Sequence, residues 1–345
     1  MLWFIGLGIS GTEGLSSTTL KVLKTADIVF LENFTSPIGR SELAKIKKFT
    51  KGKFQIAPRW MVEDGKAILS AAKKKNVVLL SYGDPYIATT HIELRTRAES
   101  EKIKTRSIHA ASAITSLIGE CGLHYYKIGR PVTIMRELQS LTTVYYTIYE
   151  NLIRGTHCIL ILEYNSDLNF FLEPKEALSN LLLTEKEQKR NVIDESMFAI
   201  VASRIGSKNQ GIIAGKISSL LNKDFGKSPH TIILPGRLHF TEYDALKAFA
   251  ECIDDPFDNS SRIQKISDQM LAKYIPKARK ALDEVSKQFK GDKNLEPVIE
   301  NAQLYIDDAE KFHKEGKEEL AILSIGYAEG LIDALRLSKG IDPWT

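Results

Sequence analysis

Residues 76–91 read Asn-Val-Val-Leu-Leu-Ser-Tyr-Gly-Asp-Pro-Tyr-Ile-Ala-Thr-Thr-His. The apolar run predicts a buried strand at residues 76–81, and Gly83-Asp84-Pro85 follows where that strand ends. Ligands of open α/β sheets bind beyond the carboxyl ends of the strands, and a glycine there lets a ligand approach the backbone. Asp84 is therefore a candidate to hold a ribose hydroxyl or an ammonium group. The alternative is a strand-to-helix turn that Asp84 caps.

Strands and helices alternate on both sides of this stretch. Short β-branched runs predict the strands, and amphipathic segments predict the helices, with Thr241 as a plausible N-cap of the last one. The predicted strands are 2–5, 26–31, 76–81, 105–109, 157–162, 198–202 and 231–234, and the predicted helices are 15–24, 67–75, 112–120 and 242–252. This order is typical of a parallel α/β architecture.

A glycine-rich loop, Gly6-Leu-Gly8-Ile9-Ser10-Gly11, follows the first predicted strand. Its glycines fit the G-x-G-x-x-G pattern of dinucleotide-binding domains, and Glu32 ends the next strand about where a ribose-binding carboxylate belongs. A nicotinamide-dependent oxidoreductase is one class that this pattern allows. A glycine turn that serves another nucleoside ligand is equally compatible with it.

Strand signals stop near residues 254–261, and three helical segments follow at about 262–289, 295–314 and 317–339. Apolar residues recur at three- and four-residue steps in the second and third segments, which predicts a three-helix bundle with these residues in its core. Pro276 should kink or divide the first helix. The two stripes are Val298, Ala302, Tyr305, Ala309 and Phe312, and Leu320, Leu323, Tyr327, Leu331 and Leu335.

Composition narrows the classes of protein. The 345 residues carry a net charge of only +4 with no run of five or six like charges, which argues against a nucleic-acid partner. Cys121, Cys158 and Cys252 are scattered, which argues against a disulfide framework and a zinc site, and we expect no metal. We expect neither a signal peptide nor a membrane span, and hence a cytoplasmic protein.

Several blocks together resemble the diphthine synthase family, within the tetrapyrrole-methylase-like methyltransferases. They occur in the family's order over residues 1 to about 250 and comprise 2–9, 83–91, 107–112, 128–134, 204–207 and 229–239. The resemblance implies two α/β domains of the tetrapyrrole methylase type, at residues 1–104 and 105–253, with the cofactor in the cleft between them, usually in a homodimer. The helical domain would then span 261–345.

The resemblance also implies a reaction and a site. S-adenosyl-L-methionine would methylate the amino group of a modified histidine, the diphthamide precursor, on translation elongation factor 2. The amine must lose a proton first, and His91, His109 and Asp84 are possible acceptors, although no motif designates one, so the catalytic base is unassigned. The implied cofactor contacts are Ile9, Asp84, Ile87, Ser112, Ala113, Leu162, Ile205 and His230.

Two regions depart from the family's pattern. Segment 135–147 does not match it closely, and the C-terminal bundle is absent from its common form and resembles a small archaeal helical domain of unknown function. An archaeal-type protein follows from that likeness, and docking, dimerisation and stabilisation are all compatible with such a domain. The alternatives are methylation of a tetrapyrrole or an RNA, the oxidoreductase above, and an inactive catalytic half on a scaffold.

Overall fold

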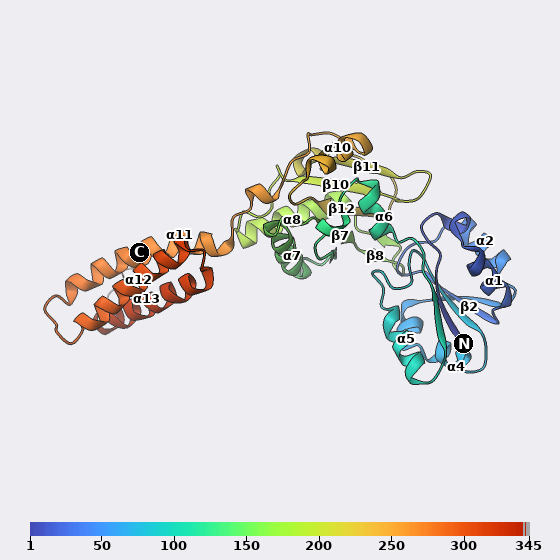
Figure 1. Cartoon of the computed structure of the whole chain (residues 1–345), viewed down its shortest axis with the longest axis horizontal. Coiled ribbons are helices and arrows are strands. Elements are labelled where there is room, and N and C mark those ends of the chain that lie inside the picture. Colours follow the sequence, from blue (N-terminus) through green and yellow to red (C-terminus); the bar gives the residue numbers. More distant parts are fainter. Residues whose placement is uncertain (341, 343–345) are drawn as a thin grey trace. The chain divides into compact units, whose positions relative to one another are not determined.

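The structure, a computed structural model, describes residues 1–340 and 342. It comprises two compact units, Met1–Ile263 and Gln264–Thr345, and each is described by itself (Figure 1). Among the described residues, no helix combines the length and the apolar character that a membrane crossing requires.

The first sheet is wholly parallel, as the alternating pattern predicts. Its strands are β1 (Leu2–Gly6), β2 (Ile28–Glu32), β3 (Lys53–Ala57), β4 (Val77–Ser81) and β5 (Thr105–Ile108), in the order β3-β2-β4-β1-β5. The strand at 105–108, which we assigned to the second domain, pairs with β1 and completes this sheet. We therefore propose that the boundary between the two α/β domains lies after Ile108 rather than after residue 104.

Helices cover both faces of this sheet. Val77 and Leu79 of β4 join one apolar core, and Val78 and Leu80 join the other, because successive side chains of a strand point to opposite faces. One core includes α3 (Arg59–Asp64), α4 (Lys66–Ala72) and α5 (His91–Ser100), and the other includes α1 (Ser17–Thr25) and α2 (Arg40–Phe49). Burial on both faces explains why β4 is a continuous apolar run.

The second sheet is mixed, so the expectation of parallel strands throughout was wrong here. Its strands are β6 (Val132–Ile134), β7 (Cys158–Leu162), β10 (Phe198–Ser203), β11 (Gly211–Lys216), β12 (His230–Leu234) and β13 (Glu251–Cys252), in the order β13-β11-β10-β12-β7-β6. β10 pairs antiparallel with both β11 and β12, and β12 pairs antiparallel with β7. Periodicity predicts a strand but not its direction, which the connections decide.

Helices cover both faces of the second sheet as well. The core on one face includes α7 (Leu141–Ile153), α8 (Pro174–Gln188) and α9 (Ile217–Leu220), and the other includes α6 (Ala113–Glu120) and α10 (Phe240–Phe249). A short ribbon of β8 (Tyr164–Asn165) and β9 (Phe170–Phe171) follows β7. The remaining 3-10 turns are Gly11–Gly14, Tyr125–Lys127, Leu138–Ser140 and Ser260–Arg262.

The predicted bounds and cap of α10 were wrong. The helix begins at Phe240 and ends at Phe249, and residues 251–252 form the strand β13. Its N-cap is His239 rather than Thr241, and the Glu242 side chain accepts the backbone N–H of His239. This reciprocal capping box satisfies donors at the helix start and outweighs the cap preference of threonine.

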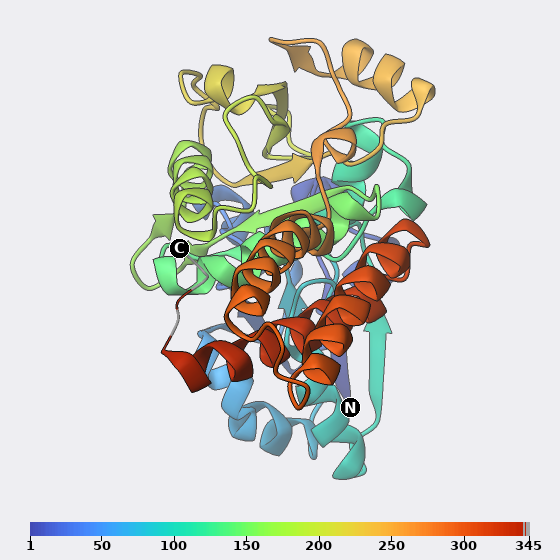
Figure 2. The same cartoon turned by 90° about the vertical axis from the view of Figure 1, so that its left-hand side faces the viewer.

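The second unit is an antiparallel three-helix bundle of α11 (Ile266–Gln288), α12 (Glu296–Lys314) and α13 (Glu318–Lys339), which lie side by side in Figures 1 and 2. α11 is continuous through Pro276, so the proline does not divide it. The predicted stripe of α12 packs in the core, but that of α13 was only partly right, because Leu331 and Leu335 pack in the core and the other three residues do not. Leu320, Leu323 and Tyr327 are 45%, 58% and 56% exposed.

Small residues decide which face of α13 is buried. Ala321 and Ala328 are fully buried, as are Ala302 and Ala309 of α12. Alanine faces allow two helices to approach closely, whereas leucine and tyrosine at the same positions would hold them apart. The bundle therefore buries a face of α13 that combines these alanines with Ile325, Ile332 and Leu335, and it leaves Leu320, Leu323 and Tyr327 outside.

Candidate functional site

The carboxyl end of β4 opens into a cavity of about 390 Å³, which we call the apolar pocket. Its walls come from loops that follow β4, β5, β7 and β10 and from the start of β12. The volume lies within the range of roughly 300–1,000 Å³ that small-molecule sites occupy. Six of the eight residues predicted to contact a cofactor line this pocket: Ile87, Ser112, Ala113, Leu162, Ile205 and His230.

Two glycine loops meet at the mouth of this pocket. The backbones of Gly8 and Gly83 exchange two hydrogen bonds, of 3.1 and 2.9 Å. A Cβ atom on Gly6 would lie 2.4 Å from the carbonyl oxygen of Gly83. Gly6 and Gly8 therefore allow the two loops to touch, which explains these two glycines of the G-x-G-x-x-G string without a dinucleotide.

Glu32 does not face a ligand cavity either. It is fully buried, and its Oε2 accepts the backbone N–H groups of Phe34 and Thr35 at 3.1 and 3.0 Å. Its Oε1 has no hydrogen-bond partner, and burial raises its pKa to about 7. The ribose-binding role that the dinucleotide reading required of Glu32 was therefore wrong, because the carboxylate supports its own loop.

Ile9 lies beside the apolar pocket rather than in it. It lines a neighbouring cavity of about 390 Å³ with the loop at residues 10–13. A Cβ atom on Gly206 would come within 2.5 Å of the Ile9 side chain, and the Tyr82 hydroxyl donates to the Ile9 carbonyl at 2.9 Å. Tyr82 lines both cavities, so Ile9 contributes to the shared wall.

Asp84 cross-links two loops and is outside the lining of the apolar pocket. Its Oδ1 accepts the N–H of Tyr86 at 2.9 Å, and its Oδ2 accepts the N–H of Ala110 at 3.3 Å. The same Oδ2 lies 2.9 Å from Nδ1 of His109, whose side chain is mostly exposed. These contacts match the structural alternative for Asp84, in which its carboxylate organises the turn after β4.

His230 presents an acceptor that lacks a protein partner. The residue is buried, its Nε2 lies 3.3 Å from the carbonyl oxygen of Phe225, and its Nδ1 makes no hydrogen bond. Burial lowers the pKa of His230 although Glu173 lies 3.6 Å from Nδ1, so the ring is neutral near pH 7. With Nε2 as the donor to Phe225, Nδ1 has a free lone pair at the pocket wall.

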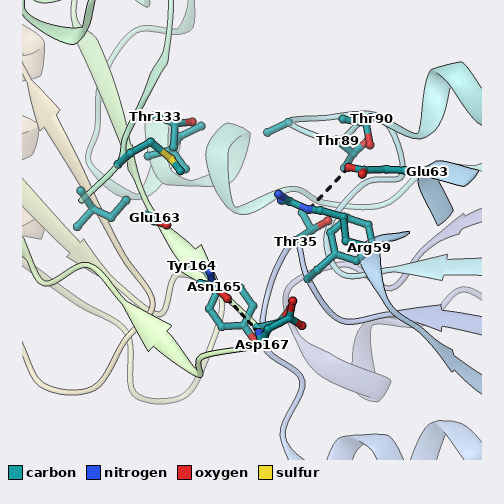
Figure 3. Close-up of a pocket in the computed structure, with 16 residues that line it drawn as sticks. Thr35, Arg59, Glu63, Thr89, Thr90, Thr133, Glu163, Tyr164, Asn165 and Asp167 are labelled. Atoms are coloured by element: carbon teal, nitrogen blue, oxygen red, sulfur yellow. Dashed lines mark hydrogen bonds and ion pairs between the residues drawn. The ribbon is translucent and has the colours of Figure 1, made fainter. Parts of the chain in front are cut away.

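A second, polar cavity of about 420 Å³ adjoins the first, and we call it the polar pocket (Figure 3). The two share Thr35, Ala88 and residues 161–164. The further polar side chains that line it are Arg59, Glu63, Thr89, Thr90, Thr133, Asn165, Ser166 and Asp167.

Most residues of the polar pocket were not predicted from the sequence. Thr89 and Thr90 belong to the Ala-Thr-Thr-His string, whereas residues 163–167 lie in none of the blocks that carry the family resemblance. A signal was available, because these polar residues follow the strand β7 directly, at the end where parallel α/β sites form.

The three candidate proton acceptors lie outside the lining of both pockets. His91 is buried with Nδ1 3.0 Å from the carbonyl oxygen of Pro85, and burial lowers its pKa. His109 and Asp84 contact each other, as described above. Among residues 1–340 and 342, no group of three or more His, Cys, Asp or Glu side chains is arranged to hold a metal ion.

Comparisons with known proteins agree with this fold. Residues 1–221 match the model of the tetrapyrrole (corrin/porphyrin) methylases, and residues 273–341 match a family described as a protein of unknown function. Diphthine synthase of Methanocaldococcus jannaschii is 37% identical over 258 residues, which cover 73% of this chain and all of the relative.

Two further comparisons point the same way. A diphthine synthase of Methanococcus maripaludis is 35% identical over 256 residues, with the same coverage of 73% and 100%. A crystal structure of diphthine synthase superposes with a TM-score of 0.64 at 28% identity and covers 76% of this chain and 99% of that one. All three matches leave about a quarter of this chain uncovered.

Proposed function

The chain belongs to the tetrapyrrole methylase family and, within it, to the diphthine synthases, and we propose that it methylates the modified histidine of translation elongation factor 2 with S-adenosyl-L-methionine. This reaction is a step of diphthamide biosynthesis. The observation that carries the proposal is the 37% identity to a diphthine synthase over that relative's entire length. The pocket that gathers six of the predicted contacts supports it.

The residues present fit S-adenosylmethionine. Ile87, Ala113, Leu162 and Ile205 supply apolar walls, which suit an adenine ring and a methionine chain. His230 Nδ1 is a buried acceptor that an adenine amino group or a ribose hydroxyl would satisfy. When bound, the cofactor supplies a methyl group on a positively charged sulfur.

The other two of the eight predicted contact residues, Ile9 and Asp84, act less directly in this proposal. Ile9 shapes the wall between the apolar pocket and its neighbour, and Asp84 holds the Gly83 turn in place. The protein contributes mainly by positioning, because a displacement in which a nitrogen–carbon bond forms as a carbon–sulfur bond breaks needs alignment above all. The proton that the amine loses would pass to water, because His91, His109 and Asp84 lie outside the lining of both pockets.

Three finer features are part of the same proposal. A homodimer follows from the family's usual assembly, and a cytoplasmic location follows from an acceptor that is a translation factor. An archaeal origin accords with the methanogen relatives and with the helical domain at residues 273–341.

Calorimetric titration with S-adenosylmethionine and with NAD tests the proposal. The matched variants are Ala113→Phe, which fills the apolar pocket at the first residue of α6, and Ala67→Phe, at an exposed position near the start of α4. We expect micromolar binding of S-adenosylmethionine by the intact protein and by Ala67→Phe, and none by Ala113→Phe.

Methyl transfer to elongation factor 2 that carries the aminocarboxypropyl histidine would complete the test. Binding of NAD without S-adenosylmethionine would overturn the proposal and restore the oxidoreductase. Binding of S-adenosylmethionine without transfer to this acceptor would overturn the choice of substrate.

A further inference from the structure

The polar pocket carries opposite charges on its walls. Arg59 is the sole cationic side chain among the described residues that line it, and Glu63, Glu163 and Asp167 are its carboxylates. In Figure 3, Arg59 and Glu63 lie on one wall, Glu163 lies on the facing wall, and Asp167 lies at the end of the cavity near Tyr164. A cavity with this pattern matches a ligand that bears both a carboxylate and an ammonium group.

Arg59 is positioned to bind an anion. It is the first residue of α3, and its guanidinium lies 5.3 Å from the ring centroid of Phe34. Stacking on an aromatic face orients the planar guanidinium and leaves its N–H groups for a carboxylate. Its ion pair with Glu63 is long, at 3.8 Å, and its side chain is 64% exposed, so most of its donors are available.

The opposite wall is suited to a cation. Glu163 is fixed there, since its Oε2 accepts the N–H of Arg136 at 2.8 Å. Tyr164 lines both pockets, and the pKa of its hydroxyl is raised by burial and by the charges of Glu32 and Asp167. An ammonium group that contacts Glu163 would therefore lie where the polar pocket meets the apolar pocket, because Glu163 lines both.

We propose that the polar pocket receives the amino-acid end of the acceptor side chain and that Arg59 binds its carboxylate, which turns the amino group toward the apolar pocket. This inference rests on the proposed function and adds the residue that orients the acceptor. Arg59 acts here as a binding residue for the acceptor and not for the methyl donor.

Steady-state kinetics at saturating S-adenosylmethionine test the inference. The variant is Arg59→Met, the conservative variant is Arg59→Lys, and the matched control is Lys66→Met, which removes an 85%-exposed cation at the start of α4, outside the lining of both pockets. We expect Arg59→Met to raise KM for the acceptor protein by at least tenfold. Arg59→Lys should raise this KM less than Arg59→Met does, because an ammonium still binds a carboxylate, although with one contact rather than two. Lys66→Met should match the wild type.

A small probe separates carboxylate binding from a structural role. L-2-aminobutyrate should compete with the acceptor protein several-fold better than its amide, and Arg59→Met should abolish that difference. An unchanged KM in Arg59→Met, or equal inhibition by the acid and the amide in the wild type, would overturn the inference.

The cofactor titration tells this failure apart from failure of the proposed function. Arg59→Met should bind S-adenosylmethionine within about twofold of the wild type, and a large loss would contradict the assignment to the acceptor side. If the wild type itself binds no S-adenosylmethionine, the proposed function fails and this inference fails with it.

Discussion

Glu242 and His157 form a completely buried pair in which Oε1 of the carboxylate lies 2.9 Å from Nε2 of the ring. Gly236 donates its N–H to the other ring nitrogen, so Nε2 carries the proton and the ring is neutral. The same carboxylate accepts the backbone N–H groups of His124 and His239, each at 2.8 Å, and the ammonium of Lys127. The string Pro-Gly-Arg-Leu-His at residues 235–239 thus belongs to a buried network that joins α10 to the start of β7.

Glu242→Gln should lower the free energy of unfolding by roughly 2–4 kcal/mol, because it removes the buried charge that the partly buried ammonium of Lys127 contacts. The midpoint of urea unfolding measures the loss. Glu251→Gln is the control, since its pair with Lys223 is exposed and should contribute under about 1 kcal/mol. Equal losses in the two variants would contradict the network.

The lowered pKa of Glu242 predicts that the fold loses stability in acid. Burial opposes ionisation of Glu242, but the hydrogen bonds from His239, Lys127, His124 and His157 outweigh it and hold its pKa at about 2, below the ordinary 4.5. A lowered pKa stabilises the folded state above pH 4.5, and that contribution is lost as the pH falls from 4.5 toward 2. The wild type should therefore lose stability in this window more steeply than Glu242→Gln, as urea midpoints between pH 5 and 3 would show.

The raised pKa of Glu32 predicts that stability depends on pH with the opposite sign. Burial raises its pKa to about 7, so its contribution to stability is complete below pH 4.5 and is lost as the pH rises through 7. Glu32→Gln stays neutral and keeps an oxygen for the N–H groups of Phe34 and Thr35. Between pH 5 and 8, the free energy of unfolding of Glu32→Gln should rise by on the order of 2 kcal/mol relative to that of the wild type. Parallel stability curves for the two proteins would refute the assignment.

His230→Phe should weaken binding of S-adenosylmethionine about tenfold, because it keeps the ring volume and removes the acceptor Nδ1. Calorimetry at pH 7 measures the change. His313→Phe, which removes a half-exposed histidine from the bundle, should bind as the wild type does. Unchanged affinity in His230→Phe would mean that the cofactor makes no polar contact at this position.

Two variants of Asp84 distinguish a direct contact with the cofactor from a role in organising the turn after β4. Asp84→Asn keeps an oxygen for the N–H of Tyr86, so it should bind S-adenosylmethionine within about threefold of the wild type. Asp84→Ala removes the contacts to Tyr86, Ala110 and His109 and should bind at least tenfold more weakly. If Asp84→Asn binds S-adenosylmethionine as weakly as Asp84→Ala does, the carboxylate itself contacts the cofactor.

Local pattern was sufficient for most elements. The strand β4 and the helix α12 follow from apolar residues a few positions apart. Family resemblance then placed six residues, from Ile87 to His230, that line one cavity. These features depend on neighbours along the chain or on recognisable strings, so the sequence contains them directly.

Tertiary structure alone decided the rest, because those features depend on partners far apart in the chain. Glu242 and His157 are separated by 85 positions, and Arg59 meets residues 163–167 only across the cavity. The exposed face of α13 depends on how closely α12 can approach its alanines, which periodicity does not measure. The sequence by itself therefore determined the elements and the family, whereas packing decided which side chains share a pocket, a buried charge or a helix interface.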